Sequence, residues 1–294
     1  MVVGGAGFIG SHLVDRLLAE GAAVDVVDDL STGSLANLAE ARAVGGHLKI
    51  HHLDARSDEL AALVALRRPE VMYHLAWMPP GVGGHATLAA AVASTLSLLE
   101  AARRNGVTKV VTTLPAAALY GEVPPRDLPV KEGRPWEPLG PRGIVARAVA
   151  DLFVSYRERH ALEYTALALA NAYGPRQRAD GGVVAAFETA LAAGSPVTLH
   201  GDGRQTRDFV YIDDAVDALA RAATRGGGLV VNVGTGVATP VRDLLSLLGG
   251  RGVATTQVPR TPDDVDRCAL SVVRARIHLA WAPWTELADG LRAR

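Results

Sequence analysis

The chain has 294 residues, 49% hydrophobic and 21% charged, enough to bury a sizeable core in one large or two smaller domains. Its formal net charge of -1 argues against nucleic acid and anionic membrane surfaces as partners and favours small molecules. Without a charged leader or an apolar run of about 18 residues, we expect neither a signal peptide nor a membrane span. The single cysteine, Cys268, excludes an internal disulfide and a thiolate metal cluster, and it predicts a buried thiol and a cytoplasmic location.

Short runs rich in Val, Ile and Leu alternate with amphipathic stretches rich in Ala, Leu and Arg, the pattern of βα units that build a parallel sheet. Strands are predicted at 1–3, 24–27, 48–53, 71–75, 109–113, 165–169 and 229–233. Helices are predicted near 11–20, 58–67, 87–105, 143–160 and 213–223. Two segments rich in proline or glycine, 123–141 and 174–182, are predicted to be surface loops. The fold class is therefore α/β, with a Rossmann-type doubly wound parallel sheet.

The strongest motif is "VVGGAGFIGSHLVDRLL", in which glycines 4, 7 and 10 follow a strand and open a helix. Gly4 permits a tight turn, Gly7 lets the backbone approach a pyrophosphate, and Gly10 permits close packing of the helix. The helix N-terminus then offers free N–H groups and a positive dipole to phosphates. The motif predicts a dinucleotide-binding site.

An acidic residue at the end of the second strand favours NAD as the dinucleotide. In "VDVVDDL", Asp28 lies 18 residues after Gly10, where a carboxylate can bind both hydroxyls of an adenosine ribose. A carboxylate there repels a 2′-phosphate, which disfavours NADP. The neighbouring Asp29 is a second candidate, with a capping role for the following turn as its alternative.

A series of further motifs resembles the extended short-chain dehydrogenases that act on nucleotide sugars, especially UDP-glucose 4-epimerases and related dehydratases. These motifs, "GGAGFIGSHL", "DDLSTG", "HLDAR", "YHLAW", "LYGE", "NAYGPRQ", "GDGRQTRDFVYIDD" and "NVGTG", occur in the family's order over nearly the whole chain. The resemblance implies an NAD-binding Rossmann domain at 1–168, completed by about 207–235. It implies a smaller C-terminal α/β domain for the nucleotide sugar, at 169–206 and 236–294.

The resemblance also implies which residues contact the two ligands. Asp54 is expected beside the adenine, and the segment from His74 to Ala76 is expected along the middle of the cofactor. The expected cofactor-binding residues are Gly4, Gly7, Phe8, Ile9, Gly10, Asp28, Asp29, Asp54, Ala55, Leu75 and Ala76. The expected substrate-binding residues are Asn171 near the diphosphate, Val183 near the base, and Arg207 and Arg260 on the phosphates. For Arg207 the alternative is a surface ion pair with Asp208.

The catalytic residues of the family are missing from their expected positions. Family members use a tyrosine and, four residues later, a lysine that lowers the pKa of the tyrosine, in a stretch of the type "SPYGxSK". This stretch aligns with "GPRGIVA", which puts Arg142 and Ala146 at the two positions. None of the three lysines, Lys49, Lys109 and Lys131, follows a tyrosine by four residues. The catalytic residues are thus unknown.

Other polar positions of the family's active site are also changed. The hydroxyl-rich run before "YG" reads Leu114 to Ala118 here, and Ala91 stands where an asparagine is usual. Tyr120 is expected to be structural. His74 could titrate near neutrality at the cofactor cleft. His85, in a loop with Trp77 and Met78, is the most plausible unorthodox acid or base, with a solvated loop histidine as its alternative.

Two interpretations follow. The chain is either an NAD-dependent nucleotide-sugar epimerase or dehydratase that uses substitute groups, or a non-catalytic sensor or partner subunit of an active relative. The resemblance implies a homodimer through helices 87–105 and 143–160, which could alternatively serve only the core. No spacing of metal ligands is present, so no metal is expected.

Overall fold

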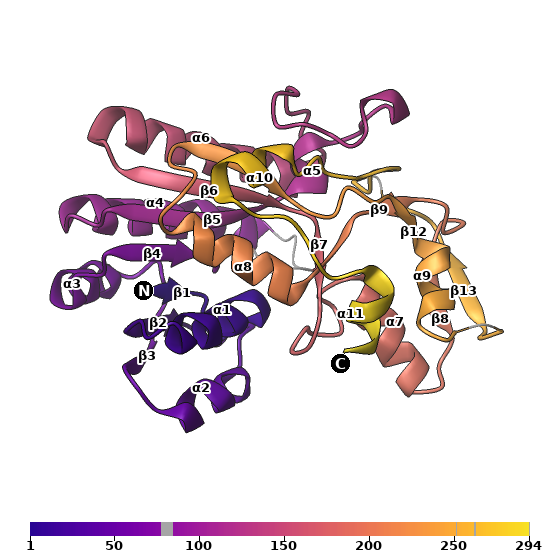
Figure 1. The fold of residues 1–294 in the computed structure, drawn as a ribbon, viewed down its shortest axis with the longest axis horizontal. Coiled ribbons are helices and arrows are strands. Elements are labelled where there is room, and N and C mark those ends of the chain that lie inside the picture. The colour runs from indigo at the N-terminus through magenta and orange to yellow at the C-terminus, as the bar shows by residue number, and fades with distance from the viewer. Residues whose placement is uncertain (78–84, 251, 262, 294) are drawn as a thin grey trace.

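Seven parallel strands form the central sheet in a computed structural model that describes residues 1–77, 85–250, 252–261 and 263–293. The strand order is β11-β6-β5-β4-β1-β2-β3, so that β1 lies between β2 and β4 (Figure 1). The bounds are β1 Val2–Val3, β2 Val24–Asp28, β3 Leu48–His52, β4 Val71–His74, β5 Lys109–Pro115, β6 Glu163–Leu169 and β11 Leu229–Val233. All seven predicted strands are confirmed, with ends that differ from the prediction by no more than two residues.

Helices cover both faces of this sheet because neighbouring residues of each buried strand point to opposite sides. Val2 and Tyr73 belong to the hydrophobic cluster under α1 and α8, whereas Val3 and Met72 belong to the cluster under α3, α4 and α6. The covering helices are α1 Phe8–Ala19, α3 Asp58–Arg67, α4 His85–Arg104, α6 Gly140–His160 and α8 Ile212–Ala222. They confirm the doubly wound class predicted from the sequence.

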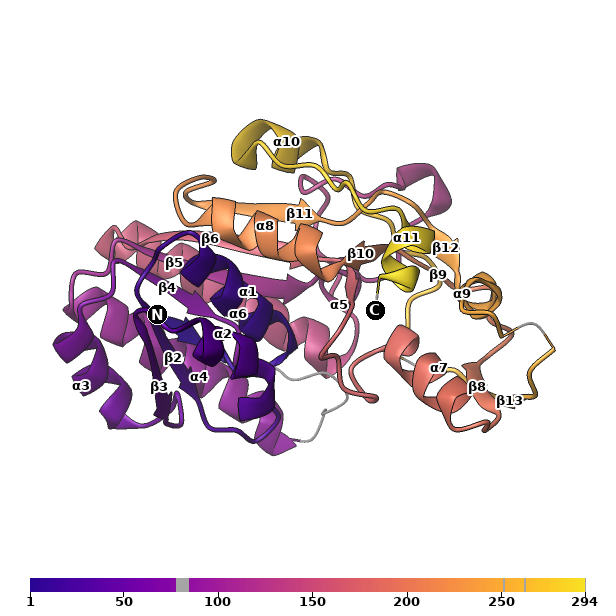
Figure 2. The same cartoon turned by 60° about the horizontal axis from the view of Figure 1, so that its bottom comes forward.

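A smaller group of elements stands beside the carboxyl ends of the central strands, at the right of Figure 1 and Figure 2. Its helices and short strands are α7 Val183–Ala192, β8 Val197–His200, β9 Thr206–Arg207, β12 Thr239–Pro240, α9 Val241–Leu247 and β13 Thr255–Val258. Strand β8 pairs with β13, and β9 pairs with β12. Two further strands, β7 Asn171–Tyr173 and β10 Phe209–Tyr211, pair in parallel where the chain passes to and from this group.

The remaining elements are short. They are α2 Ala39–Val44, α5 Ala116–Tyr120, α10 Val273–Leu279, α11 Leu287–Arg292, and 3-10 helices at Leu35–Leu38 and Pro125–Asp127. Helix α10 packs against α8 and β11, so part of the C-terminal segment returns to the central sheet. The division of the chain into two domains stays a prediction.

The expected surface loop at 123–141 is partly wrong. Val123 and Val130 are buried, and Val130 forms a parallel bridge with Leu270. The Val130 amide donates to the Ala269 carbonyl (2.8 Å), and the Ser271 amide donates to the Val130 carbonyl (2.9 Å). Long-range backbone pairing therefore buries a stretch whose prolines indicated a loop. The second predicted loop, 174–182, is confirmed between β7 and α7.

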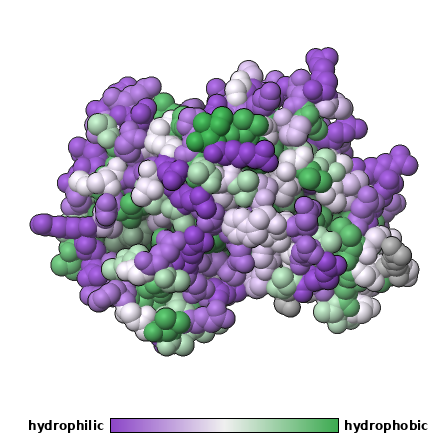
Figure 3. Space-filling view, in the orientation of Figure 1, coloured by the Kyte–Doolittle hydropathy of each residue, from purple (hydrophilic) through white to green (hydrophobic). Residues whose placement is uncertain are grey.

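The face of the molecule seen in Figure 3 is mostly hydrophilic, with a hydrophobic group of side chains over α10, where Val273 and Ile277 are exposed. None of the helices within the described ranges is long and apolar enough to cross a membrane.

Candidate functional site

A cleft of about 830 Å³ lies at the carboxyl ends of the central strands. The chain changes direction along the sheet at β1, because β2 follows on one side and β4 on the other. Such a switch point leaves a crevice between the turns that follow the two halves of the sheet, which is where α/β proteins bind dinucleotides. Residues from the smaller group of elements, including Val183 and Arg207, form the opposite wall of the cleft.

The glycine-rich turn has the geometry that the motif predicts. Gly4 has φ +87°, and a Cβ there would lie 2.8 Å from the Ala76 nitrogen, so only glycine fits. A Cβ on Gly10 would lie 2.1 Å from the Gly4 oxygen, which explains the close approach of α1 to the turn. A Cβ on Gly7 would meet only the Gly4 oxygen, at 3.3 Å, and the rest of its surroundings is open cleft.

The N-terminus of α1 faces this open space. Gly7 is the N-cap, and Phe8, Ile9 and Gly10 follow it along the lining of the cleft. The first turn of a helix has N–H groups without partners inside the helix, and α1 has no acidic residue in that turn to compensate them. The arrangement therefore offers N–H groups and positive dipole to a phosphate.

Asp28 ends β2 beside the turn and is buried. Its Oδ2 accepts a hydrogen bond from the Ala6 amide, and its Oδ1 accepts one from the Leu30 amide, both at 2.9 Å. Each carboxylate oxygen has a second lone pair for a ligand hydroxyl. Burial raises the pKa of Asp28, against the opposing effect of these two amides.

The other predicted residues of the cofactor half also line the cleft. Asp29 accepts hydrogen bonds from the Ser31 amide (2.9 Å) and hydroxyl (2.6 Å), which is the capping alternative considered from the sequence. Asp54 accepts from Nε of Arg56 (2.9 Å), and this hydrogen bond holds the pKa of Asp54 below its usual value. The cleft is lined by Gly4, Gly7, Phe8, Ile9, Gly10, Asp28, Asp29, Asp54, Ala55, Leu75 and Ala76.

These residues fit a dinucleotide. Gly7 leaves a cradle that a side chain would fill, α1 directs unpaired N–H groups toward it, and Asp28 keeps free lone pairs at the end of β2. When bound, NAD would accept and return a hydride. The role of each residue toward the cofactor stays a prediction.

In the other half of the cleft, the structure brings together Asn171, Val183 and Arg207. Arg207 is buried, forms an ion pair with Asp264, and donates through Nη1 to the Thr206 carbonyl (2.7 Å). A buried guanidinium held in this way presents a fixed cation to the cleft, as phosphate binding requires. The structure does not place Arg260 in the described lining. Its guanidinium pairs with Asp266 and donates to the Asp264 carbonyl (2.8 Å).

The alternative of an ion pair between Arg207 and Asp208 is wrong. Asp208 is completely buried, and its carboxylate accepts from the amides of Thr235 (2.7 Å), Gly236 (2.9 Å) and Leu270 (2.9 Å). Successive residues of an extended chain point in opposite directions, so the two side chains separate. Asp208 faces the core while Arg207 faces the cleft.

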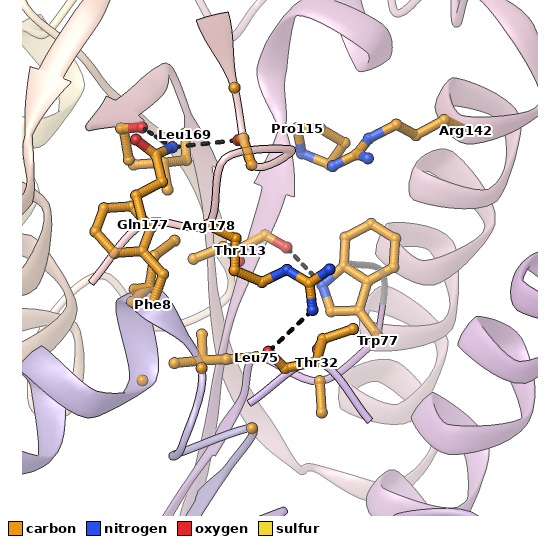
Figure 4. A pocket seen from close by; sticks show the side chains of 18 of the residues that line it. Phe8, Thr32, Leu75, Trp77, Thr113, Pro115, Arg142, Leu169, Gln177 and Arg178 are labelled. Atoms are coloured by element: carbon orange, nitrogen blue, oxygen red, sulfur yellow. Dashed lines mark hydrogen bonds between the residues drawn. The ribbon is translucent and has the colours of Figure 1, made fainter. Parts of the chain in front are cut away.

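Arg142 lies at the end of the cleft near the last residues of β5. It belongs to the first turn of α6, and its side chain extends toward Pro115 in Figure 4. Burial lowers the pKa of its guanidinium, which still keeps an arginine protonated near neutrality. Ala146, one helical turn later, is completely buried in the cluster with Leu119 and Phe153, and it does not reach the described lining.

Apolar side chains surround this end of the cleft. Trp77 is buried, and its indole N–H donates to the Thr113 carbonyl (2.9 Å; Figure 4). The run that replaces the family's hydroxyl-rich stretch contributes Leu114, Pro115, Ala116, Ala117 and Ala118 to the lining. Met78 lies outside the described residues, as does the side chain of His85, so the expectation for His85 stays a prediction.

The expectation that His74 titrates near neutrality at the cleft is wrong. His74 is completely buried beneath α4, and its Nε2 lies 3.0 Å from Oγ1 of Thr95. Burial lowers its pKa to about 3, so the imidazole is neutral at neutral pH, and it is absent from the lining among the residues described. Tyr120 is structural as expected, because it is buried and donates to Oδ1 of Asn232 (2.7 Å).

An arginine-rich part of loop 174–182 also lines the cleft, and its contribution was not predicted from the sequence. Arg176 forms ion pairs with Asp15 on α1 (2.6 Å) and Glu40 on α2 (3.0 Å), and so ties the loop to these two helices. Arg178 pairs with Asp180 (2.8 Å) and reaches toward the Thr32 carbonyl (3.5 Å; Figure 4). The cluster of charges in "PRQRAD", directly after the "NAYG" motif, was the available signal. Over the part of the chain that the structure describes, no group of acidic, histidine or cysteine side chains could hold a metal ion.

The fold and the glycine-rich turn define a Rossmann-type nucleotide-binding protein of the extended short-chain dehydrogenase class. The profile of the NAD dependent epimerase/dehydratase family matches residues 1–234, and the chain belongs to this family, which uses NAD. It is 40% identical to the UDP-glucose 4-epimerase of Mycolicibacterium smegmatis, over 99% of this chain and 95% of that protein.

Solved structures agree with this assignment. The UDP-glucose 4-epimerase of Thermotoga maritima with UDP-glucose has a TM-score of 0.88 and 33% identity, covering 99% of this chain and 95% of that one. The Thermus thermophilus UDP-glucose 4-epimerase in complex with NAD has a TM-score of 0.88 and 32% identity, covering 99% and 96%. The whole fold, including the smaller group of elements, is thus shared with enzymes that act on nucleotide sugars.

Proposed function

We propose that this protein binds NAD and a UDP- or other NDP-sugar in the cleft but has weak or no orthodox epimerase activity. In this proposal, NAD lies along the turn at Gly7 and the end of β2 at Asp28. The nucleotide sugar lies against Asn171, Val183 and Arg207, with its sugar directed toward Arg142. The biological role is then that of a sensor or of a partner subunit for an active relative.

One observation carries the proposal. Among the cleft-lining residues that the structure describes, there is no tyrosine, lysine, histidine, cysteine or glutamate. Six aspartates do line the cleft, namely Asp28, Asp29, Asp54, Asp180, Asp263 and Asp264. Five of them accept hydrogen bonds or form ion pairs with their neighbours, and the sixth, Asp263, lies against Gly140 at the start of α6.

The chemistry of the family needs a group that takes a proton from a sugar hydroxyl while hydride leaves the carbon. Arg142 cannot take that proton because its guanidinium is already protonated. His74 is buried away from the cleft. A general acid or base contributes roughly 10²- to 10⁴-fold to a rate, so its loss leaves little turnover.

Purified protein incubated with NAD and a panel of nucleotide sugars tests the proposal. Calorimetry is expected to detect binding of NAD and of at least one nucleotide sugar, whereas chromatography of the sugars shows less than one turnover per active site. Multiple turnovers to a defined product would contradict the non-catalytic interpretation and favour an enzyme with substitute groups. Absence of any nucleotide-sugar binding would contradict the proposed ligand.

A restored enzyme provides a second test. The double variant Arg142→Tyr with Ala146→Lys places the family's two groups one helical turn apart on α6. If the rest of the site is intact, this variant gains measurable epimerisation of the nucleotide sugar that binds. The matched control Arg142→Phe with Ala146→Lys carries the same ring and lysine without the hydroxyl, and it should stay inactive.

We also propose a homodimer through helices 87–105 and 143–160. Helices α4 and α6 pack side by side, and each leaves an apolar side chain on its outer surface, Leu96 (39% exposed) and Ile144 (60% exposed). Sedimentation at micromolar concentration is expected to show a dimer, and Leu96→Arg with Ile144→Arg should shift it to monomer. A wild-type monomer at that concentration would contradict the proposal.

The cytoplasmic location remains a proposal as well. Its support is the single cysteine, Cys268, which is buried and whose pKa burial raises to about 12, so it is inert as a thiolate. Fractionation of the source cells tests it.

A further inference from the structure

At the end of the cleft next to α6, the guanidinium of Arg142 lies among apolar side chains. Arg142 extends from the first turn of α6 toward Pro115 (Figure 4). The ring of Trp77 lies on the same side of the cleft, held by its hydrogen bond to the Thr113 carbonyl, and the turn after β5 adds small apolar side chains. A guanidinium in such surroundings interacts with a ligand's charge more strongly than it would in water.

The position of Arg142 relative to the two expected phosphate-binding positions of the cleft indicates which group of a bound ligand it contacts. The N-terminus of α1 and Arg207 supply the positive charge for the two diphosphates. Arg142 lies at neither place, because it extends toward Pro115 at the end of β5, where, under the proposed function, the sugar approaches the second half of the dinucleotide. Its partner on the ligand therefore belongs to the sugar ring.

A neutral hexose is a poor match for this position, since its hydroxyls carry no charge. The guanidinium is planar and presents parallel N–H groups, which fit the two oxygens of a carboxylate. Among the carboxylates that line the cleft, Asp263 lies against Gly140, the first residue of α6 and two residues before Arg142. The negative charge of Asp263 repels a carboxylate on the ligand. Removing that charge should therefore strengthen the binding of an acidic sugar, whereas removing the charge of Arg142 should weaken it.

We propose that Arg142 binds a carboxylate on the sugar, so that the ligand is a nucleotide sugar of the uronic acid class in preference to a neutral hexose. This inference rests on the proposed function, because it assumes that a nucleotide sugar enters the cleft. In it, the arginine that replaced the family's catalytic tyrosine is a specificity-determining residue.

Calorimetric titration of the NAD-loaded protein with UDP-glucuronate, UDP-glucose and UDP tests the inference. A hydrogen-bonded charge pair of this kind predicts roughly ten- to a hundredfold tighter binding of UDP-glucuronate than of UDP-glucose. Arg142→Gln should reduce this ratio to below about threefold, and Arg142→Lys, a point charge without the planar fork, should retain only part of it.

Two further variants complete the experiment. Arg147→Gln removes an exposed arginine of α6 that lies 3.8 Å from Asp151, outside the cleft lining, and it should leave the ratio unchanged. Asp263→Asn should increase the ratio. Equal affinity of the wild type for UDP-glucuronate and UDP-glucose, or a preference for UDP-glucuronate that survives Arg142→Gln, would overturn this inference and leave the proposed function standing. Failure of UDP-glucuronate, UDP-glucose and UDP to bind would contradict the proposed function as well.

Discussion

The Ala6 amide donates a hydrogen bond to Oδ2 of Asp28 (2.9 Å), and this hydrogen bond joins the end of β2 to the glycine-rich turn after β1. The residue that is expected to bind the ribose thus also holds the turn that is expected to bind the pyrophosphate. Changes at Asp28 should therefore affect both the choice of dinucleotide and the order of the turn.

The first prediction concerns that choice. Asp28→Ser removes the negative charge that repels a 2′-phosphate while keeping a small hydrogen-bonding group. The ratio of NAD to NADP affinity, measured by calorimetry, is expected to fall at least tenfold. Asp58→Asn, an exposed acidic residue in the first turn of α3, is the control and should not change the ratio. An unchanged ratio in Asp28→Ser would show that the carboxylate does not face the ribose.

The second prediction is that Gly10 and Gly7, two glycines of one motif, serve stability and NAD binding, respectively. Gly10→Ala puts a methyl group 2.1 Å from the Gly4 oxygen, so the turn must shift, and the free energy of unfolding should fall by about 3 kcal/mol or more. Gly7→Ala meets only the Gly4 oxygen, at 3.3 Å, so its stability should change little while its methyl group fills the cradle and weakens NAD binding. Urea denaturation and NAD titration measure the two effects. Gly133→Ala, with open space around it, is the control for both.

The third prediction compares two arginines that both interact with Asp264. Arg207→Gln removes the buried cation of the cleft and should weaken UDP binding ten- to a hundredfold, given about 1.5–3 kcal/mol for a hydrogen bond to a charged group. Arg260→Gln changes a residue outside the described lining of the cleft and should alter UDP affinity less than threefold. Equal losses in the two variants would mean that Asp264, rather than Arg207, determines the affinity.

The fourth prediction concerns pH and His74. Its pKa is about 3 in the folded protein against 6.5 in the unfolded chain, so below pH 6.5 the unfolded state binds a proton that the folded state does not. Stability is therefore lost as the pH falls, by about 2 kcal/mol between pH 7 and pH 5 from this one group. His74→Asn should flatten the dependence of unfolding free energy on pH over this interval. His278→Asn, an exposed histidine of α10, should leave the slope unchanged.

Much of the central sheet was predictable because its strands are buried on both faces and contain continuous apolar runs, as in the run from Ala166 to Leu169. The glycine-rich turn was equally clear, since Gly4 and Gly10 have no sterically acceptable substitutes. In both cases the tertiary structure requires the residue types, apolar in the strands and glycine in the turn, that the local sequence pattern already shows.

The strands of the smaller group were not predicted from periodicity because they are too short to show any. Strand β9 has only two residues, Thr206 and Arg207, and its position depends on pairing with Thr239 and Pro240 far along the chain. The burial of His74 was missed for a related reason. Its environment is set by Thr95 and the rest of α4, which no local pattern around β4 reveals.

Burial of Asp208 has a consequence for recognition at the neighbouring residue. Four donors from Thr235, Gly236 and Leu270 converge on its carboxylate and fix the backbone between β9 and β10. Arg207 therefore starts from a backbone that has already lost its conformational entropy during folding. A ligand that engages this arginine does not have to order the chain on binding, so more of the interaction energy remains as affinity.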